Sequence, residues 1–139
     1  MTDFADFEIS LRRRDGTTYS IETRYTPSGS DADIRSDKPM SATFDLETLQ
    51  VMIVDPVEYG NMLAESLFAD QNFKTAFSDA RKGAQTQQVP LRVRLLVGLS
   101  APELNTVYWE TLRDPDDKSP LFTSENILFS RYLSSSDWR

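Results

Sequence analysis

The stretch from Val89 to Leu99, VPLRVRLLVGL, has the clearest strand pattern in the chain. Leucine and valine occupy every second position from Leu91 to Val97, and two arginines lie between them. Successive side chains of a strand point to opposite faces of its sheet, so this alternation predicts a strand with one face buried in a core. Such a strand needs partners in a sheet, and the N-terminal part of the sequence supplies them.

The N-terminal part predicts a β-hairpin. Apolar and polar residues alternate over 5–13 and again over 18–25, as in two half-buried strands. Asp15-Gly16 lies between these runs, and the pair is typical of a tight hairpin turn because glycine adopts a positive φ at no steric cost. We expect the hairpin and the strand at 91–97 to share one mainly antiparallel sheet.

Between the hairpin and this strand, apolar residues recur at helical spacing. Each of three helical segments follows an aspartate whose side chain can cap the first turn. We expect helices near 46–54, 57–69 and 71–83, and Ile53 and Val57 belong to their apolar stripes. The predicted fold class is therefore α+β, a mainly antiparallel sheet with an N-terminal β-hairpin and helices packed on one face.

The predicted core draws on both the strands and the helices. Its members are Phe7, Ile9, Leu11, Tyr19, Ile21, Leu63, Leu67, Phe77, Leu91, Val93, Leu95, Trp109 and Leu112. One or two further strands are expected between Leu121 and Leu133. By contrast, residues 27–39, PSGSDADIRSDKP, contain one large apolar side chain, Ile34. We expect 28–38 to be a weakly ordered, protease-sensitive loop.

Two groups of aspartates have spacings that could suit a hard cation. The aspartates of residues 31–37 are spaced like the first ligands of a calcium loop, but the glycine and the glutamate of such a loop are missing. Asp114, Asp116 and Asp117 form the second group, in a turn that contains a proline. Carboxylates placed in this way are usually solvated, so we expect no metal site and no cofactor.

Composition restricts the possible functions. The chain has 139 residues, a formal net charge of −7, no cysteine and no histidine. It therefore lacks a Ser/His or Cys/His nucleophile pair and any thiolate or imidazole metal ligand, and we expect it not to be an enzyme. Its acidic surface repels phosphates, so neither nucleic acid nor a membrane is an expected partner. Its first residues show no signal-peptide pattern, and a cytoplasmic location is expected.

Short motifs in the second half of the chain resemble the CHAT family, whose caspase-like domains often occur beside tetratricopeptide repeats. In chain order, the motifs are Leu91 to Leu95, Pro102-Glu103-Leu104, Trp109-Glu110-Thr111-Leu112, Asp114-Pro115, Leu121-Phe122 and Arg131-Tyr132-Leu133. Upstream, Gly60, Leu63 and Leu67-Phe68 are similar to a Gly-x-x-Leu…Leu-Phe helix of the same proteins. The likeness covers roughly 57–133 and departs from the family pattern at Tyr108, where the family usually has proline.

The resemblance implies a function. In this family the His and Cys of the proteolytic pair lie on a caspase-like sheet that begins after the Arg-Tyr-Leu strand, where this sequence stops. Residues 1–133 would then form a single accessory domain, and 134–139 would begin a linker to a downstream caspase-like domain. The implied function is that of a non-catalytic N-terminal accessory or interaction domain of a CHAT-type protein. Its partner would be the downstream domain of its own chain or other protein.

The residues alone leave an alternative function open. A free-standing small protein could bind a ligand, or act as an enzyme, with carboxylates and tyrosines. The length of the parent gene product separates this alternative from the accessory domain.

The candidate interaction residues are Trp109, Glu110, Arg131 and Trp138. Trp109 would anchor an interface with Glu110 as its charged neighbour. The alternative, which we favour, buries Trp109 in the core. Glu110 would then cap a turn or pair locally with an arginine such as Arg92 or Arg131. Trp138 lies one residue from the end of the sequence, and we expect the segment from Ser134 to Arg139 to run into the first strand of the downstream domain. The strand near Ile127 to Leu133 would then expose apolar surface where that domain docks.

Overall fold

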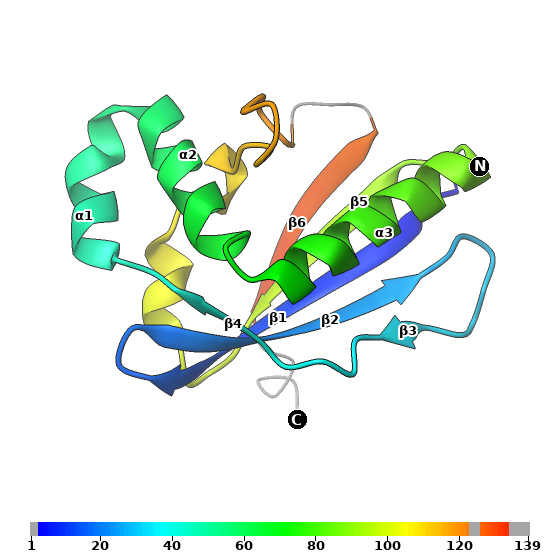
Figure 1. Ribbon diagram of the computed structural model, residues 1–139, viewed down its shortest axis with the longest axis horizontal. Coiled ribbons are helices and arrows are strands. Elements are labelled where there is room, and N and C mark those ends of the chain that lie inside the picture. Colours follow the sequence, from blue (N-terminus) through cyan, green and yellow to red (C-terminus); the bar gives the residue numbers. More distant parts are fainter. Residues whose placement is uncertain (1–2, 123–125, 134–139) are drawn as a thin grey trace.

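The computed structural model describes residues 3–122 and 126–133, and its helices pack on a single sheet (Figure 1). The strands are β1 (Ala5–Asp15), β2 (Thr18–Thr26), β3 (Ile34–Arg35), β4 (Met40–Thr43), β5 (Leu91–Val97) and β6 (Ile127–Leu133). The α-helices are α1 (Leu46–Val51), α2 (Pro56–Leu67) and α3 (Gln71–Gln87). Three short 3-10 helices are η1 (Met52–Val54), η2 (Pro102–Thr106) and η3 (Trp109–Thr111). The predicted α+β class is confirmed.

The strand order in the sheet is β3-β2-β1-β5-β6, and β4 pairs with β2 as well. The pairs β1/β2, β2/β3 and β2/β4 are antiparallel, so the sheet is mostly antiparallel as predicted. The hairpin and β5 do share this sheet, but β5 runs parallel to β1, and β6 runs parallel to β5. A parallel pair needs a long crossover, and the three α-helices between the hairpin and β5 supply it.

The β1/β2 hairpin turns at the predicted Asp15-Gly16 pair. Gly16 has φ +41, in the left-handed region that favours glycine. The register pairs Leu11 with Ile21, which places apolar residues opposite each other on the same face. A register shift between Arg13 and Asp15 marks an irregularity just before the turn.

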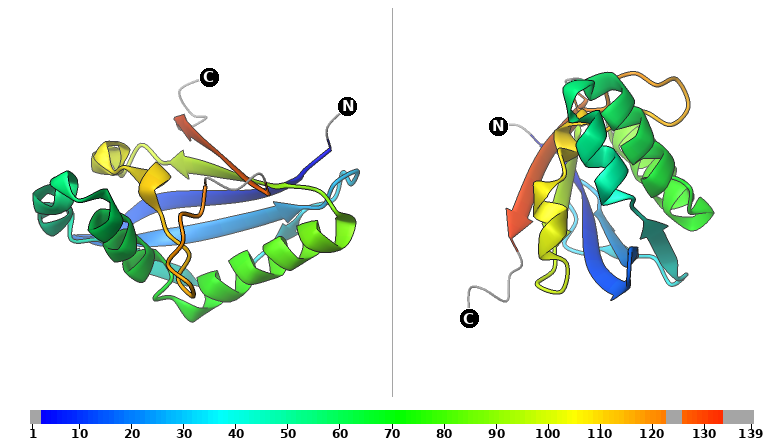
Figure 2. Two further views of the ribbon diagram at one scale, coloured as in Figure 1. Left: turned by 90° about the horizontal axis from the view of Figure 1, so that it is seen from above. Right: turned by 90° about the vertical axis from the view of Figure 1, so that its left-hand side faces the viewer.

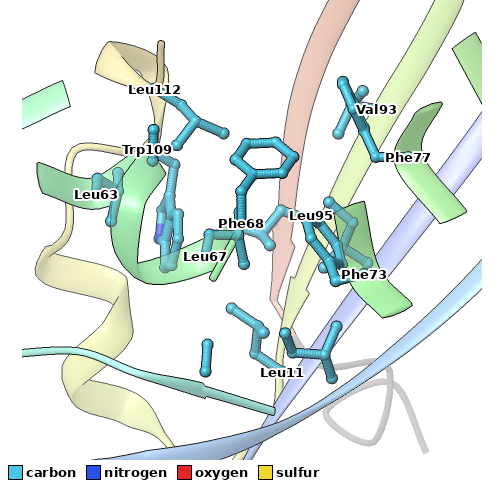
Figure 3. Close-up of a cluster of buried hydrophobic side chains, with 14 of the residues drawn as sticks. Leu11, Leu63, Leu67, Phe68, Phe73, Phe77, Val93, Leu95, Trp109 and Leu112 are labelled. Carbon is cyan, nitrogen blue, oxygen red and sulfur yellow. The ribbon is translucent and has the colours of Figure 1, made fainter. Parts of the chain in front are cut away.

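The core lies between the sheet and α2 and α3, which lie on one side of it (Figure 2). Alternate residues of β1 and β5 are buried on this side, and the rings of Phe73 and Phe77 pack on Phe7 at centroid distances of 6.2 and 5.8 Å. Phe68 meets the Phe77 ring edge-on at 5.4 Å (Figure 3). Every residue of the predicted core is buried. A single-sided core of this kind explains the strict alternation in both strands.

The opposite face of the sheet carries paired charges. Asp6 of β1 accepts a hydrogen bond from Arg92 of β5 at 2.6 Å. Glu8 accepts one from Arg24 of β2, also at 2.6 Å. These side chains are half-buried, and their ion pairs link the neighbouring strands β5, β1 and β2 across this face.

The first helical segment differs from its prediction. The α1 helix ends at Val51, and the chain continues as the tighter η1. The change from 3.6 to 3.0 residues per turn moves Ile53 off the stripe that buries Leu49, and Ile53 is exposed. Val57 is also exposed, because the buried side of α2 begins only at Tyr59. The predicted inward positions of Ile53 and Val57 are therefore wrong.

The third helix runs four residues beyond its predicted end at Gly83. A β-carbon built on Gly83 would lie 2.5 Å from the hydroxyl oxygen of Tyr25. Because Gly83 has no side chain, the Tyr25 side chain of β2 can approach α3 closely. The glycine does not end the helix. The helix ends instead at Gln88, which has a left-handed conformation.

The segment 27–39 contains a strand that its composition did not predict. The two residues of β3 pair with Tyr25 and Arg24 of β2. Asp33 lies 3.6 Å from the Arg24 guanidinium, so an ion pair supports the same contact. Residues 31–39 are nevertheless exposed throughout. The protease sensitivity of this segment stays a prediction.

Candidate functional site

The clearest candidate for an interaction site is the outer edge of β6. This strand pairs with β5 on one side, with Leu91 opposite Ile127 and Leu95 opposite Arg131. Within 3–122 and 126–133, no strand pairs with its other side. An unpaired strand edge presents a row of backbone donors and acceptors to a partner.

The ladder with β5 determines which backbone groups face outward. The amide of Leu91 donates to the carbonyl of Asn126 at 2.8 Å. In a parallel ladder, every second residue bonds to the same neighbour, so the even-numbered residues of β6 face β5. The backbone groups of Ile127, Phe129 and Arg131 therefore point to the free edge. Leu128, whose side chain is exposed, adds apolar surface beside it.

Arg131 links β6 to the segment that follows β5. Its guanidinium donates to the carbonyl of Asn105 at 2.8 Å and pairs with the Glu110 carboxylate at 3.4 Å. The structure therefore brings together two of the predicted interaction residues, Glu110 and Arg131. Both keep exposed charged groups at the surface beside the edge of β6.

Trp109 lies in the core, where the favoured alternative places it. Its side chain is 1% exposed, and its indole nitrogen donates to the carbonyl of Leu104 at 2.9 Å. The ring of Phe44 meets it edge-on at 5.6 Å. Trp109 therefore holds the η3 turn on which Glu110 stands and offers little surface to a partner. Trp138, the remaining predicted residue, lies outside the described residues.

Gly60 allows α2 to approach the η3 turn closely. A β-carbon built on Gly60 would overlap the carbonyl oxygen of Thr111 and lie 2.9 Å from Cγ of Arg113. One residue earlier, the hydroxyl of Tyr59 accepts a hydrogen bond from the Tyr108 amide at 3.1 Å. The glycine of the Gly-x-x-Leu motif thus has a packing role that its spacing alone did not reveal.

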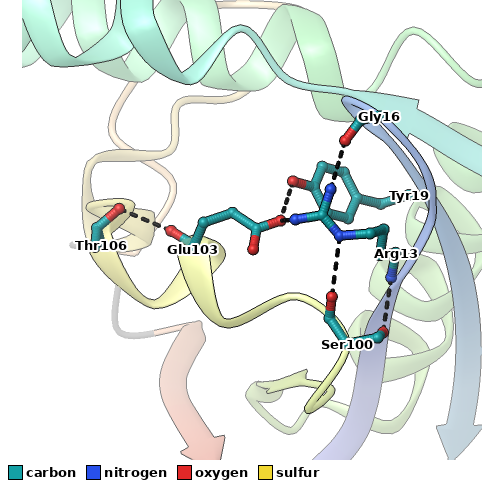
Figure 4. A network of polar contacts seen from close by, with 6 residues as sticks. All are labelled: Arg13, Gly16, Tyr19, Ser100, Glu103 and Thr106. Atoms are coloured by element: carbon teal, nitrogen blue, oxygen red, sulfur yellow. Dashed lines mark hydrogen bonds and ion pairs between the residues drawn. The ribbon is translucent and has the colours of Figure 1, made fainter.

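A polar network joins the tip of the hairpin to η2 (Figure 4). Arg13 donates to the carbonyl of Ser100 at 3.1 Å, to that of Gly16 at 2.7 Å and to the Glu103 carboxylate. The hydroxyl of Tyr19 donates to the same carboxylate, and the Arg13 guanidinium lies 5.8 Å from the centre of the Tyr19 ring. Sequence reasoning missed this network, because its members are separated by most of the chain.

The protonation states of Tyr19 and Glu103 favour a structural role for this network over a catalytic one. Burial, the hydrogen bond to Glu103 and its charge raise the pKa of Tyr19 to about 12, although Arg13 acts in the other direction. Burial acts to raise the pKa of Glu103, but hydrogen bonds from Tyr19 and Arg13 lower it overall. Tyr19 is therefore neutral and Glu103 charged at neutral pH, and neither pKa lies near the range that general acid–base catalysis needs.

The second group of aspartates, in the turn at Asp114, is engaged by protein groups. Asp114 is buried and accepts hydrogen bonds from Arg81 at 2.7 Å and from the Asp116 amide at 2.8 Å. Asp117 accepts from the amide and the hydroxyl of Ser119. In the described part of the chain, no group of three or more acidic side chains could hold a metal ion.

One cavity contains tyrosine and carboxylate groups together. It has a volume of about 390 Å³ and lies between β2, β3 and α3. Tyr25 and Ile34 line it from the sheet side, and Thr75 and Asp79 line it from α3. Burial raises the pKa of Tyr25 above its ordinary value. The cavity has the size and the mixed lining of a small-ligand site.

Comparison of the chain with protein-family models, with curated proteins and with solved structures found no match. The CHAT relationship expected from the motifs therefore stays a prediction. Across the described residues, no helix has the length and apolar character needed to cross a membrane.

Proposed function

We propose that this chain is a non-catalytic accessory domain of a CHAT-type protein and that it binds another protein domain along β6. The proposal rests on the outer edge of this strand, with which no other strand of the described residues pairs. A strand added there would form main-chain hydrogen bonds with Ile127, Phe129 and Arg131. The exposed side chain of Leu128 would be covered at the same time.

The positions of the resembling motifs support the proposal. Motifs separated along the sequence meet around β6: the strand at Leu91 to Leu95 pairs with it, and Arg131 contacts Asn105 and Glu110. Gly60 of the upstream motif lies against Thr111 of the Trp-Glu-Thr-Leu motif. The similarity therefore falls on contacts that build one end of the domain, beside the proposed docking edge.

Composition and charge support the non-catalytic part of the proposal. The chain has no histidine and no cysteine, the residues that a caspase-like protease uses for proton transfer and nucleophilic attack. The polar network at Arg13 is held by internal hydrogen bonds. In this proposal, catalysis belongs to a different domain.

Amide hydrogen exchange, measured residue by residue by NMR, tests the proposal. We compare the isolated 139-residue chain with the complete natural gene product. Docking at the edge should slow exchange at Ile127, Phe129 and Arg131 by about 100-fold or more. The amides of Leu128 and Ser130 face β5, so they should be protected in both samples and serve as the internal control. Equal exchange at the three outward amides, or a gene product without a caspase-like sheet, would refute the proposal.

A second function, binding of a small ligand, is favoured by the cavity between β2, β3 and α3. Its lining offers an apolar wall of Tyr25 and Ile34 and a carboxylate from Asp79. A panel of small aromatic amines and acids should then raise the midpoint of thermal unfolding. The substitution Thr75→Trp fills the cavity and should abolish this increase. A panel without effect on the unmodified chain would exclude this function for these ligands.

A further inference from the structure

Four of the eight large apolar side chains that are exposed in the described residues fall within seven consecutive positions, 51–57. They are Val51, Ile53, Val54 and Val57, and we call them the valine corner. Val51 is 78% exposed and Val54 87% exposed, which is extreme for aliphatic side chains in a folded domain.

The local backbone explains why these side chains project together. A 3-10 helix has three residues per turn, so Val51 and Val54 lie one above the other at η1. Asp55 then caps α2, and Pro56 occupies its first turn, so Val57 follows within the same helix junction. The backbone of the valine corner is therefore fixed by the junction between η1 and α2, which Asp55 caps.

In the stretch of sequence that contains the valine corner, every charged side chain is acidic. Residues 39–73 contain six carboxylates and no lysine or arginine. Glu47 and Glu58 flank the corner on α1 and α2, and no ion pair in the described residues involves either of them. Arg113 contacts α2 at Gly60, but its side chain donates to the carbonyl of Lys118.

This combination of apolar and acidic surface restricts the possible occupants. A second copy of the chain would bring like charges together, and an anionic membrane would be repelled for the same reason. A segment with apolar side chains flanked by lysine or arginine satisfies both the valines and the carboxylates. We infer that the valine corner binds a cationic amphipathic segment of a partner protein. The inference does not depend on docking at β6, because α1 and β6 lie in different parts of the molecule (Figure 1).

Calorimetric titration with synthetic peptides tests the inference. The probe is an 18-residue amphipathic helix of leucine and lysine. One comparison peptide has the same composition in scrambled order, and the other has glutamate in place of lysine. We expect the probe to bind in the micromolar range or tighter, and we expect neither comparison peptide to bind. Binding should weaken as salt rises from about 50 to 300 mM, because the charges involved are exposed.

Matched variants locate the binding site. The double substitution Val51→Ser and Val54→Ser should weaken binding by about ten-fold or more, since it removes the most exposed part of the corner. The control is Leu99→Ser, at a residue that is 63% exposed elsewhere on the surface. All of these positions are exposed, so thermal unfolding should be unchanged in both variants.

Several outcomes would overturn the inference. Equal weakening in the corner variant and in the control would mean that the peptide binds non-specifically to an acidic protein. Full binding by the corner variant would place the site elsewhere. No binding of the probe to the unmodified chain would exclude a cationic amphipathic partner. Concentration-dependent dimerisation that Val54→Ser abolishes would assign the corner to a second copy.

Discussion

The substitution Gly60→Ala should destabilise the protein, although alanine is the better helix former. Within a helix, replacing glycine by alanine normally gains about 1 kcal/mol. At Gly60, however, the new methyl group would overlap the Thr111 carbonyl oxygen and lie 2.9 Å from Arg113 Cγ. Overpacking costs roughly 1–3 kcal/mol, and the upper end applies here because the obstacle is a backbone carbonyl, so α2 must move away from η3. We expect a net loss of about 2 kcal/mol.

Urea denaturation and thermal melting followed by circular dichroism measure this loss. For a chain of this size, about 2 kcal/mol corresponds to a decrease of roughly 8 °C in the unfolding midpoint. The matched control is Gly83→Ala, also in a helix, where the obstacle is the movable hydroxyl end of Tyr25. Its cost should be smaller, and combining it with Tyr25→Phe should reduce the cost further. A Gly60→Ala protein as stable as the unmodified chain would refute the close packing of α2 on η3.

Further predictions concern the core, the polar network and the loop. Leu95→Ala should cost about 2–5 kcal/mol in urea denaturation, whereas Leu99→Ala, at an exposed position, should change stability by less than about 0.5 kcal/mol; equal effects would contradict the assigned core. The pKa of Glu103 is lowered by folding, so its contribution to stability is present above the unfolded pKa and is lost as pH falls through the folded pKa. Glu103→Gln should therefore reduce the loss of stability in acid, and an unchanged acid titration would disprove this. Comparison of ultraviolet titrations of the unmodified chain and Tyr19→Phe should show a phenol that ionises near a pKa of about 12, and a value near 10 would contradict its bond to Glu103. Limited trypsin digestion should cut first within 28–38, and an early cut elsewhere would oppose that prediction.

The sequence predicted those strands and helices in which buried apolar residues recur at a regular spacing. The alternation in β1 and β5 reports one buried face, and the aspartate before each α-helix is the cap that the structure contains. The direction of β5 relative to β1 was not accessible in this way, because alternation is the same in parallel and antiparallel strands. The exposure of Ile53 was missed because the change from α-helical to 3-10 geometry does not alter the spacing of apolar residues in the sequence.

The candidate site was predictable only in part, for a similar reason. Arg131 was one of two arginines named as possible partners of Glu110, and it does form that ion pair. The other, Arg92, pairs with Asp6 instead. The free edge of β6 depends on strand order, which involves the whole chain. The contacts of Arg13 with Ser100 and Glu103 join distant segments, and a basic run at a hairpin end gives no indication of them.

The central position of β1 affects how the chain folds during synthesis. Its hairpin with β2 can form early, but the other edge of β1 stays unpaired until β5 has been synthesised, because Ala5 pairs with Leu91. At typical rates of 5–20 residues per second, the ribosome needs roughly 4–17 s to make the intervening chain. During that time the apolar face of the hairpin lacks α3 and β5, and β1 has an unpaired edge. The nascent chain therefore passes through an interval in which a chaperone, or a neighbouring nascent chain, can bind the strand that later becomes the centre of the sheet.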